Sequence, residues 1–507
     1  MQLVAYGAQD IYLTGNPQIT FFKVVYRRHT NFSMESIKQT FNGTADFGND
    51  VTATISRNGD LVYRMYLEHD ATFTDTTTAD ANQLNIVERY GDSLIKECEI
   101  EIGGQRIDKH TSMWKRVYSD LTQSNPSGHF GATVGPGGTT PSGNGTLYQL
   151  MTGNTYGFNT GDYDATNNKF GVNGADGSGD QTITINGITY TRGDEGTSSA
   201  DALPAKVAVN KVFLPLDFWF NRNPGLALPL IALQYHEVKV KMTFESLGNL
   251  SREIEEATFT DSIPATASTV TAAGNFELWC DYIYLDTDER RRFAQVSHEY
   301  LIEQLQYSEN TLQTASPSID LNFNHPVKEL IWCMRNEKDS TTGGRHQTPA
   351  AGKGDACSGP TSIDEMGGNW QLKLNGHDRF KERDSKYFTR TQVWQHHTGY
   401  GGISTTMMHS GTGDLNDPDT AADVGSDSIA VYSFALKPEE HQPSGTCNFS
   451  RIDNAQLVGN SIQVAADIGG LASTGDATAN NTKLTIFAVN YNVLRIMSGM
   501  GGLAYSN

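Results

Sequence analysis

The stretch CEIEIGGQRIDKH, residues 98–110, decides the fold class together with its later echo, WQLKLNGHDRFKE, residues 370–382. In the first copy Cys98, Ile100 and Ile102 alternate with acidic residues, and two glycines follow. Alternation with a period of two places one set of side chains in a core and the other in solvent, and glycine permits a tight turn. Each copy is therefore predicted to form a strand, a turn and then, after an arginine, a short helix-like segment.

Two further pairs of segments extend this internal repeat. VFLPLDFWFNRNPG (212–225) is echoed by VYSFALKPEEHQPSG (431–445). WCDYIYLDTDERR (279–291) is echoed by AVNYNVLRIMSG (488–499). The number of residues between equivalent positions of the two copies decreases along the chain. Three equivalent pairs show this: Gly104 and Gly376, Pro224 and Pro443, and Tyr282 and Tyr491. Most of the shortening falls between the first two pairs, where the first half carries a Gly-rich stretch, residues 121–202. The pattern predicts two copies of one β-domain, the first with a long surface insertion.

The composition agrees with a chain of many short strands. Of the 507 residues 50 are Gly, and only 19% are charged. A single core stops growing at roughly 250–300 residues, so two domains are expected. Each half holds enough strand-like runs for an eight-stranded sandwich. Asn58-Gly59 and Asn186-Gly187 each lie between alternating apolar runs, a pattern that predicts β-hairpins.

The charge and the cysteines exclude several classes of protein. The formal net charge is −20, and the densest basic cluster, residues 290–292, follows four acids, so direct nucleic-acid binding is not expected. The five cysteines form no CxxC pair; Cys98 and Cys280 are predicted to be buried thiols, and no disulfide framework is expected. The start of the chain has no secretory pattern, and its longest near-apolar run, residues 225–233, is far short of the ~20 residues that span a bilayer. We therefore expect folding in a reducing, soluble compartment.

The histidines and acidic residues of the chain are all best explained by structural roles. No histidines have the H-x-H spacing of a cupin metal site, and there is no phosphate-binding loop and no G-x-S-x-G elbow. His236 is expected to be a hydrogen-bonded structural residue, and the adjacent His396 and His397 to be plain surface residues. The acidic residues at 97, 99 and 101 are expected to form a solvated strand face, and those at 286–289 a salt-bridged strand end. Calcium binding by the aspartates in loop 162–180 is a weaker alternative, because the EF-hand glycine and closing glutamate are missing. We expect no catalytic residue, cofactor or metal.

Six N-x-[ST] sequons occur in the chain. Only Asn144 lies in the predicted surface insertion, and it is the candidate site for an attached glycan.

Long ordered blocks resemble one known family. GAQDIYLTGNPQITFFKVVYRRHTNFSMESI (7–37), NPGLALPLIALQYHEVK (223–239), DYIYLDTDERRRFAQ (281–295), QPSGTCNFSRIDNA (442–455) and NYNVLRIMSGMGGLAY (490–505) are similar to segments of major capsid proteins of nucleocytoplasmic large DNA viruses, most of all those of algal and other protist viruses. The resemblance implies an all-β fold of two tandem eight-stranded jelly-roll β-sandwiches, with long surface loops and short helices in the loops. It also implies a structural, non-enzymatic role.

The function implied by this resemblance is that of a shell subunit. Three chains would form a homotrimeric, pseudo-hexagonal capsomer that tiles the outer icosahedral shell of the virion. The expected partners are neighbouring capsomers, minor capsid and penton proteins, and an internal membrane beneath the shell. Assembly would take place in the host cytoplasm.

The predicted organisation is an N-terminal arm (1–20), a first jelly roll (21–296, with insertion 121–202) and a second jelly roll with a C-terminal arm (297–507). The arms are inferred because residues 1–20 and the final MSGMGGLAYSN lack a strand-turn pattern.

Three alternatives stay open at this point. The chain could be a minor capsid, vertex or spike protein of the same kind of virus. It could be a jelly-roll protein that binds or processes carbohydrate, although the sequence shows no aromatic groove with paired carboxylates. A metal-dependent cupin is disfavoured by the missing H-x-H pair.

Overall fold

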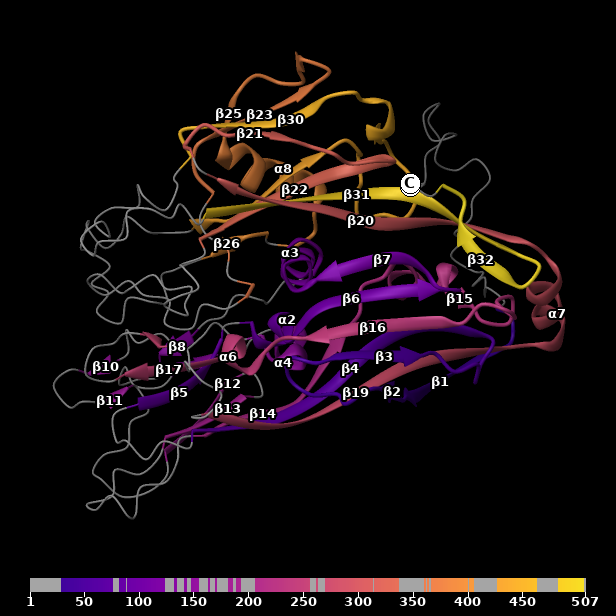
Figure 1. Ribbon diagram of the computed structural model, residues 1–507, viewed down its shortest axis with the longest axis horizontal. Coiled ribbons are helices and arrows are strands. Elements are labelled where there is room, and N and C mark those ends of the chain that lie inside the picture. Colours follow the sequence, from indigo (N-terminus) through magenta and orange to yellow (C-terminus); the bar gives the residue numbers. More distant parts are fainter. Residues whose placement is uncertain are drawn as a thin grey trace, which may run out of the picture.

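The computed structural model shows two β-sandwiches stacked on each other, with their strands along the long axis of the molecule (Figure 1). It describes residues 29–75, 82–87, 89–123, 132–134, 141–143, 147–154, 163–164, 169–170, 181–185, 188–192, 206–255, 261–262, 270–312, 314–336, 360–361, 363, 366–399, 401–404, 426–462 and 482–505. The predicted N-terminal arm and the candidate glycan site Asn144 lie outside these residues, as do Asp162, Asp176 and Asp180.

The first sandwich has two sheets. One has the order β1-β19-β4-β14, extended by β13 and β12, with β15 paired to β4; the other has the order β2-β3-β16-β6-β7. The strands are β1 (Phe32–Gln39), β2 (Phe41–Asn42), β3 (Asp50–Thr54), β4 (Leu61–Asp75), β6 (Ile95–Ile102), β7 (Gln105–Thr111), β12 (Gln181–Ile185), β13 (Ile188–Arg192), β14 (Lys206–Pro215), β15 (Leu228–Pro229), β16 (Val238–Phe244) and β19 (Val270–Leu285).

The second sandwich repeats this plan. One sheet has the order β20-β31-β22-β28, with β29 on β22 and β32 on β31; the other has the order β21-β30-β23-β24, with β25 on β23. The strands are β20 (His298–Leu312), β21 (Ser318–Asp320), β22 (Pro326–Asn336), β23 (Asn369–Leu374), β24 (His377–Asp378), β25 (Arg383–Asp384), β28 (Ile429–Ser433), β29 (Cys447–Asn448), β30 (Ala455–Asn460), β31 (Thr482–Met497) and β32 (Met500–Leu503).

Eight strands in each half occupy the same places in the same chain order. The sheet β1-β19-β4-β14 corresponds to β20-β31-β22-β28, and β3-β16-β6-β7 corresponds to β21-β30-β23-β24. The echoed segments at 98–110 and 370–382 form the equivalent hairpins β6–β7 and β23–β24. The prediction of a helix-like segment after each turn is wrong, because the chain there pairs as a strand with the one before the turn. The predicted fold of two tandem eight-stranded jelly rolls is therefore confirmed. The exact boundary at residue 296 stays a prediction.

The helices are short and lie between strands, as predicted. They are α2 (Tyr90–Leu94), α3 (Ser112–Thr122), α4 (Leu147–Thr152), α5 (Trp219–Arg222), α6 (Leu247–Leu250), α7 (Thr287–Gln295) and α8 (Gln392–His396), with a π-helical turn at Tyr387–Thr391 directly before α8 and 3₁₀ turns at Pro224–Leu226 and Phe449–Arg451. Short outlying strands are β5 (Asn82–Ile86), β8 (Ala132–Val134), β9 (Pro141–Gly143), β10 (Tyr163–Asp164), β11 (Lys169–Phe170), β17 (Ser251–Glu255), β18 (Asp261–Ser262), β26 (Ile403–Ser404) and β27 (Ser426–Asp427).

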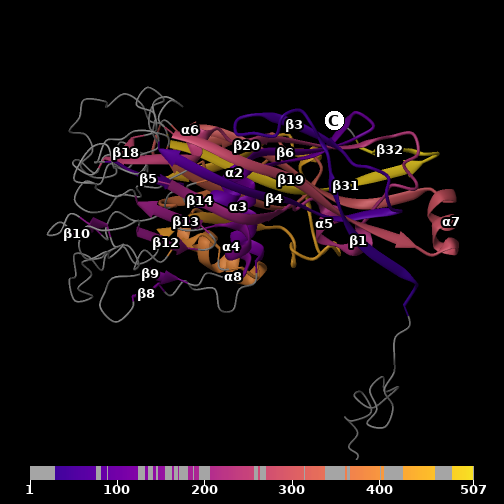
Figure 2. The same cartoon turned by 90° about the horizontal axis from the view of Figure 1, so that it is seen from below.

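Helix α7 and strand β32 lie at one end of the molecule, and β10 and β18 at the other (Figure 2). Within the described part of the chain, we find no helix with the length and apolar character needed to span a bilayer.

Each sandwich has its own apolar core, made by the alternating side chains of its two sheets. The first includes the fully buried Phe73, Tyr90 and Phe244. In the second, the ring of Trp332 lies 5.9 Å from that of Trp370 and 5.2 Å from that of Phe388. Burying large side chains of this kind contributes roughly 1.5–3 kcal/mol each, which is the main stabilisation of a sandwich.

One of the two predicted hairpins is wrong. Strands β3 and β4, on either side of Asn58-Gly59, belong to different sheets and do not pair. Gly59 serves close packing instead, because a Cβ there would lie 2.8 Å from the Cβ of Tyr282. The other prediction is confirmed: β12 and β13 pair directly across Asn186-Gly187, and they continue the main sheet rather than standing apart from it.

The end of the chain forms a hairpin rather than an arm without strand structure. Ser498 and Gly499 both have positive φ (53° and 81°), which a two-residue type I′ turn requires, and Met497 pairs with Met500 across it. Strand β32 then folds back along β31 and reaches the first jelly roll. A Cβ on Gly501 would lie 2.7 Å from Leu233 of that domain, so only glycine fits there without a shift. The prediction that this segment lacks a strand-turn pattern is wrong.

Candidate functional site

The most elaborate site in the molecule is the contact between its two jelly rolls. Helix α3 lies between the sandwiches (Figure 1) and is capped by Thr111, whose Oγ1 accepts a hydrogen bond from the N–H of Trp114 at 3.2 Å. Met113, Trp114, Val117 and Leu121 fall on one helical face, and all are buried. They pack on side chains that the second jelly roll turns away from its own core; the ring of Trp114 lies 5.3 Å from that of Phe487.

A chain of buried charges crosses the same contact. Arg222, on α5 of the first jelly roll, places Nη1 2.8 Å from Oε2 of Glu303 on β20 of the second. The other oxygen of Glu303 lies 2.7 Å from Nζ of Lys328, whose side chain is 2% exposed. Burial raises the pKa of Glu303, but the two cations outweigh that effect and hold the pKa below its usual value. The carboxylate of Glu303 is therefore ionised and has a structural role.

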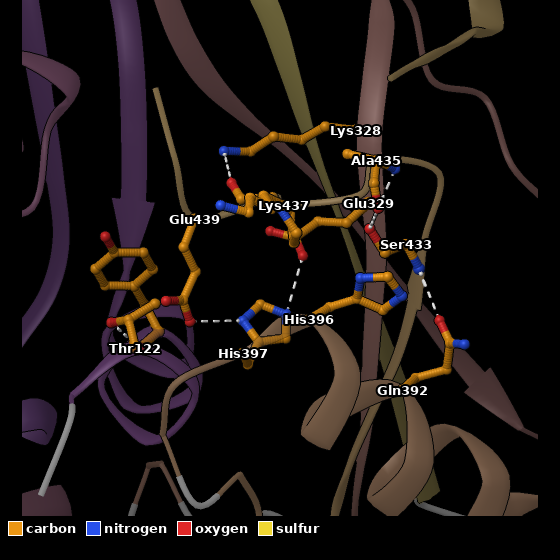
Figure 3. A network of polar contacts seen from close by, with 12 residues as sticks. Thr122, Lys328, Glu329, Gln392, His396, His397, Ser433, Ala435, Lys437 and Glu439 are labelled. Carbon is orange, nitrogen blue, oxygen red and sulfur yellow. Dashed lines mark hydrogen bonds and ion pairs between the residues drawn. The ribbon is translucent and has the colours of Figure 1, made fainter. Parts of the chain in front are cut away.

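A second charged group surrounds His397, just after α8 (Figure 3). Its Nε2 lies 3.0 Å from Oε2 of Glu329, and its Nδ1 lies 3.0 Å from Oε1 of Glu439. Burial alone would lower the pKa of His397, but the two carboxylates outweigh it and raise the pKa to about 9. The expectation of a plain surface histidine is wrong for His397: its side chain is 2% exposed. The next residue, Thr398, donates from Oγ1 to the carbonyl of Thr122 at 3.1 Å, which joins this group to the end of α3.

The carbonyls at the end of α3 find their partners in the second jelly roll. The backbone N–H groups of Gly399 and Gly401 donate to Leu121 O at 2.7 Å and to Asp120 O at 2.9 Å. The last carbonyls of a helix have no partner within it, so these bonds complete α3. Gly399 is required there, because a Cβ would lie 2.3 Å from the carbonyl oxygen of Asp120. The two jelly rolls thus share hydrogen bonds, the Arg222–Glu303 ion pair and an apolar cluster.

A cleft of about 820 Å³ opens beside this contact. Its lining includes the aromatic residues Tyr66, Tyr118 and Trp219 and four carboxylates, those of Asp217, Asp281, Glu303 and Glu439. Glu303 is engaged by Arg222 and Lys328, and Glu439 by His397. The geometry therefore favours a structural role over acid–base catalysis for Glu303 and Glu439.

The other residues considered from sequence have structural partners. His236 places Nδ1 3.2 Å from the backbone N of Gly501, which confirms a hydrogen-bonded role. The acidic strand face pairs with lysines: Glu97 with Lys109 at 2.8 Å and Glu101 with Lys241 at 2.6 Å.

The strand-end interpretation of residues 286–289 is wrong, because Asp286 caps helix α7. Arg290, on that helix, pairs with Asp60 at 3.0 Å. Cys98 and Cys280 are buried, and burial raises the pKa of the Cys98 thiol to about 12. Among the described residues, no group of three or more His, Cys, Asp or Glu is placed to hold a metal ion.

Sequence reasoning missed Arg222, Glu303 and Lys328. Each lies in an alternating or loop segment whose pattern is that of an ordinary exposed charge, and their partners come from distant segments of the chain.

Comparison with known proteins decides the family. The model described as "Major capsid protein N-terminus" matches residues 20–286, and that described as "Large eukaryotic DNA virus major capsid protein" matches residues 289–422 and 415–502. This chain belongs to the major capsid proteins of large eukaryotic DNA viruses. Its relatives in the family include the major capsid protein of Pyramimonas orientalis virus, 47% identical over 100% of this chain and 99% of that protein. The major capsid protein of Paramecium bursaria Chlorella virus 1 is 39% identical with the same coverage.

Solved capsid structures agree with this family assignment. The quasi-atomic model of the PBCV-1 virus capsid matches with a TM-score of 0.61 and 34% identity, over 96% of this chain and 100% of that one. The Faustovirus major capsid protein matches with a TM-score of 0.59 at 12% identity, over 97% and 94% of the two chains, and shows the shared fold alone. In this capsid-family chain, the contact between the jelly rolls is therefore a structural element of a shell subunit.

Proposed function

We propose that this chain is the major shell subunit of a large double-stranded DNA virus and that it assembles as a homotrimer of pseudo-hexagonal outline. One observation carries the proposal: two jelly rolls of the same topology are fixed side by side by the Arg222–Glu303 ion pair, backbone hydrogen bonds and an apolar cluster. Such a chain is a rigid body with two equivalent lobes. Three copies around a three-fold axis present six lobes, and a near six-fold tile covers flat facets efficiently.

The proposed partners follow from this role. Trimers would contact neighbouring capsomers, minor capsid proteins and penton proteins, with an internal membrane beneath the shell, after assembly in the host cytoplasm. Direct contact with the genome is not proposed, because a net charge of −20 opposes phosphate binding.

The predicted N-terminal arm, residues 1–20, would fix the subunit at the base of the shell. Deleting residues 1–15 should then impair shell assembly, and unchanged assembly would remove this part of the proposal. Glycan attachment at Asn144 likewise stays a prediction.

The alternatives give different expectations. A minor capsid, vertex or spike protein would be present in far fewer copies per virion than a shell subunit. A carbohydrate-binding protein would need free groups in its groove, whereas two of the four carboxylates that line the cleft, those of Glu303 and Glu439, are held in ion pairs.

The test is the mass of the purified full-length protein by light scattering, together with its share of total protein in purified virions. The proposal predicts a species with three times the chain mass of 55.5 kDa, and the most abundant virion protein on a stained gel. A protein that is both monomeric in solution and scarce in virions would contradict it.

A further inference from the structure

The cleft beside the contact between the jelly rolls has the size and the lining of a site for a small organic molecule. Its volume of about 820 Å³ lies within the roughly 300–1,000 Å³ of small-molecule sites. Such sites have mostly apolar and aromatic walls, and a few polar groups in them orient the ligand. The walls here carry five aromatic side chains, those of Tyr66, Tyr118, Tyr148, Phe213 and Trp219. The polar groups of the cleft therefore indicate which ligand fits.

Strand alternation brings an aromatic pair and a carboxylate to the same side of one sheet. Successive side chains of a strand point to opposite faces, so Phe213, Pro215 and Asp217 share one side of β14 and its continuation. Pro215 pairs with Tyr66 on β4, and the ring of Tyr66 lies 6.1 Å from that of Phe213. The chain stays beside β4 just before Asp217, because the N–H of Leu216 still donates to a carbonyl of β4 at 2.9 Å.

The carboxylate of Asp217 has no partner in the chain. Within the part that the structure describes, Asp217 makes no hydrogen bond and no ion pair. Burial raises its pKa above the usual value, and the attraction of Lys115, His110 and Arg222 offsets that rise only in part. Taking a carboxylate out of water without a partner costs free energy. A cation in the cleft would remove that cost.

The charges that line the cleft leave a negative excess. Of its four carboxylates, two are held in the ion pairs already described. The other two, on Asp217 and Asp281, share the cleft with one further guanidinium, that of Arg64. Among the described residues, none of these three side chains is in an ion pair; the Arg64 guanidinium lies 5.3 Å from the ring centre of Tyr63 instead. The excess therefore favours a cationic ligand.

The lining is also suited to a cation that donates hydrogen bonds. The guanidinium carbon of Arg222 lies 5.3 Å from the ring centre of Tyr118, so the aromatic wall already holds one cation by its ring face. Asn221, only 7% exposed, lines the cleft, and its Oδ1 accepts no hydrogen bond in the structure. This oxygen and the carboxylates of Asp217 and Asp281 are all acceptors. An ammonium group supplies three donors and a positive charge.

We propose that this cleft binds a small organic ammonium ion, with the ammonium group on Asp217 and the apolar body of the ligand against Tyr66 and Phe213. A neutral sugar would also bring hydrogen-bond donors, but it would leave the negative excess uncompensated. The site adds a ligand-binding activity to the chain and does not depend on the proposed trimer.

The first experiment is isothermal titration calorimetry of the full-length protein at neutral pH with two probes of nearly the same shape. Phenethylamine carries an ammonium group, and phenethyl alcohol carries a neutral hydroxyl in its place. The amine should bind one site per chain, at least about tenfold more tightly than the alcohol, because only the amine compensates the cleft charge. Equal affinity for the two probes, or no binding of the amine at millimolar concentration, would overturn the proposal.

The second experiment repeats both titrations with Asp217→Asn, which keeps the shape of the side chain and removes its charge. Amine affinity should fall at least about tenfold while alcohol affinity stays unchanged. The melting temperature should not fall, because Asp217 has no ion pair to lose. Asp50→Asn is the matched control, since Asp50 is exposed on β3 and does not line the cleft. Full amine affinity in Asp217→Asn would overturn the assignment of this carboxylate.

A third probe separates a free amine from the side chain of a protein partner. Acetyl-lysine amide, blocked at its α-amino and α-carboxyl groups, presents its ammonium group as a lysine in a protein does. Tighter binding of this probe than of phenethylamine would overturn the small-molecule assignment in favour of a lysine of a partner protein. Light scattering tests the proposed trimer separately, so failure of amine binding and failure of the trimer are distinguishable.

Discussion

Replacing His397 by glutamine should remove a large pH-dependent part of the stability. At neutral pH this buried imidazolium lies between Glu329 and Glu439, and its pKa is raised from 6.5 to about 9. At about 1.36 kcal/mol per pH unit, that rise corresponds to about 3 kcal/mol of unfolding free energy. Because the folded pKa is the higher one, the contribution is fully present below pH 6.5 and is lost as the pH rises through about 9.

The assay is urea unfolding followed by tryptophan fluorescence at pH values from 6 to 10. The wild-type protein should lose about 3 kcal/mol across the upper part of this range, and His397→Gln should be less stable at pH 7 and lack that loss. His377→Gln is the matched control, because His377 is exposed on β24. If His397→Gln kept the alkaline loss of the wild-type protein, the assignment of this ion group as a stabilising element would be refuted.

Three further changes test the contact between the jelly rolls. Lys328→Met leaves Glu303 with one cation instead of two and should cost about 3–5 kcal/mol in urea unfolding, since it breaks a buried pair; a change under about 1 kcal/mol would contradict the assignment. Trp114→Ala removes the largest side chain of α3 from the shared apolar cluster and should cost about 3–5 kcal/mol, measured in the same way with exposed Leu147→Ala as the matched control. Deleting residues 498–507 removes β32 and its contacts with Leu233 and His236, and should lower the melting temperature by calorimetry; an unchanged value would show that this strand does not join the domains.

The repeated hairpins could be predicted because their signal is local. Residues 98–110 and 370–382 carry the alternation and the glycine turn within a short stretch, and both form the expected strands. The pairing of β12 with β13, on either side of Asn186-Gly187, has a local signal of the same kind. Asn58-Gly59 has an equally strong local signal, yet the chain there crosses from one sheet to the other. The pairing of β4 with β19 and β14 depends on residues far along the chain, which no local pattern encodes.

The charged groups could not be predicted because their partners come from segments far apart in the sequence. His397 follows an exposed helix and precedes a Gly-rich loop, so its sequence context is that of a surface residue. Its carboxylate partners, Glu329 and Glu439, come from distant segments on either side of it in the sequence. The C-terminal hairpin was missed because its strand is rich in glycine, which disfavours strands in general but allows the close approach to Leu233.

The most direct test of the central claim is cryo-electron microscopy of the purified full-length oligomer, viewed along its symmetry axis. Two equivalent jelly rolls in each chain predict class averages with six lobes of similar size around a three-fold axis. Averages with three lobes, or with one isolated two-lobed body, would contradict the account.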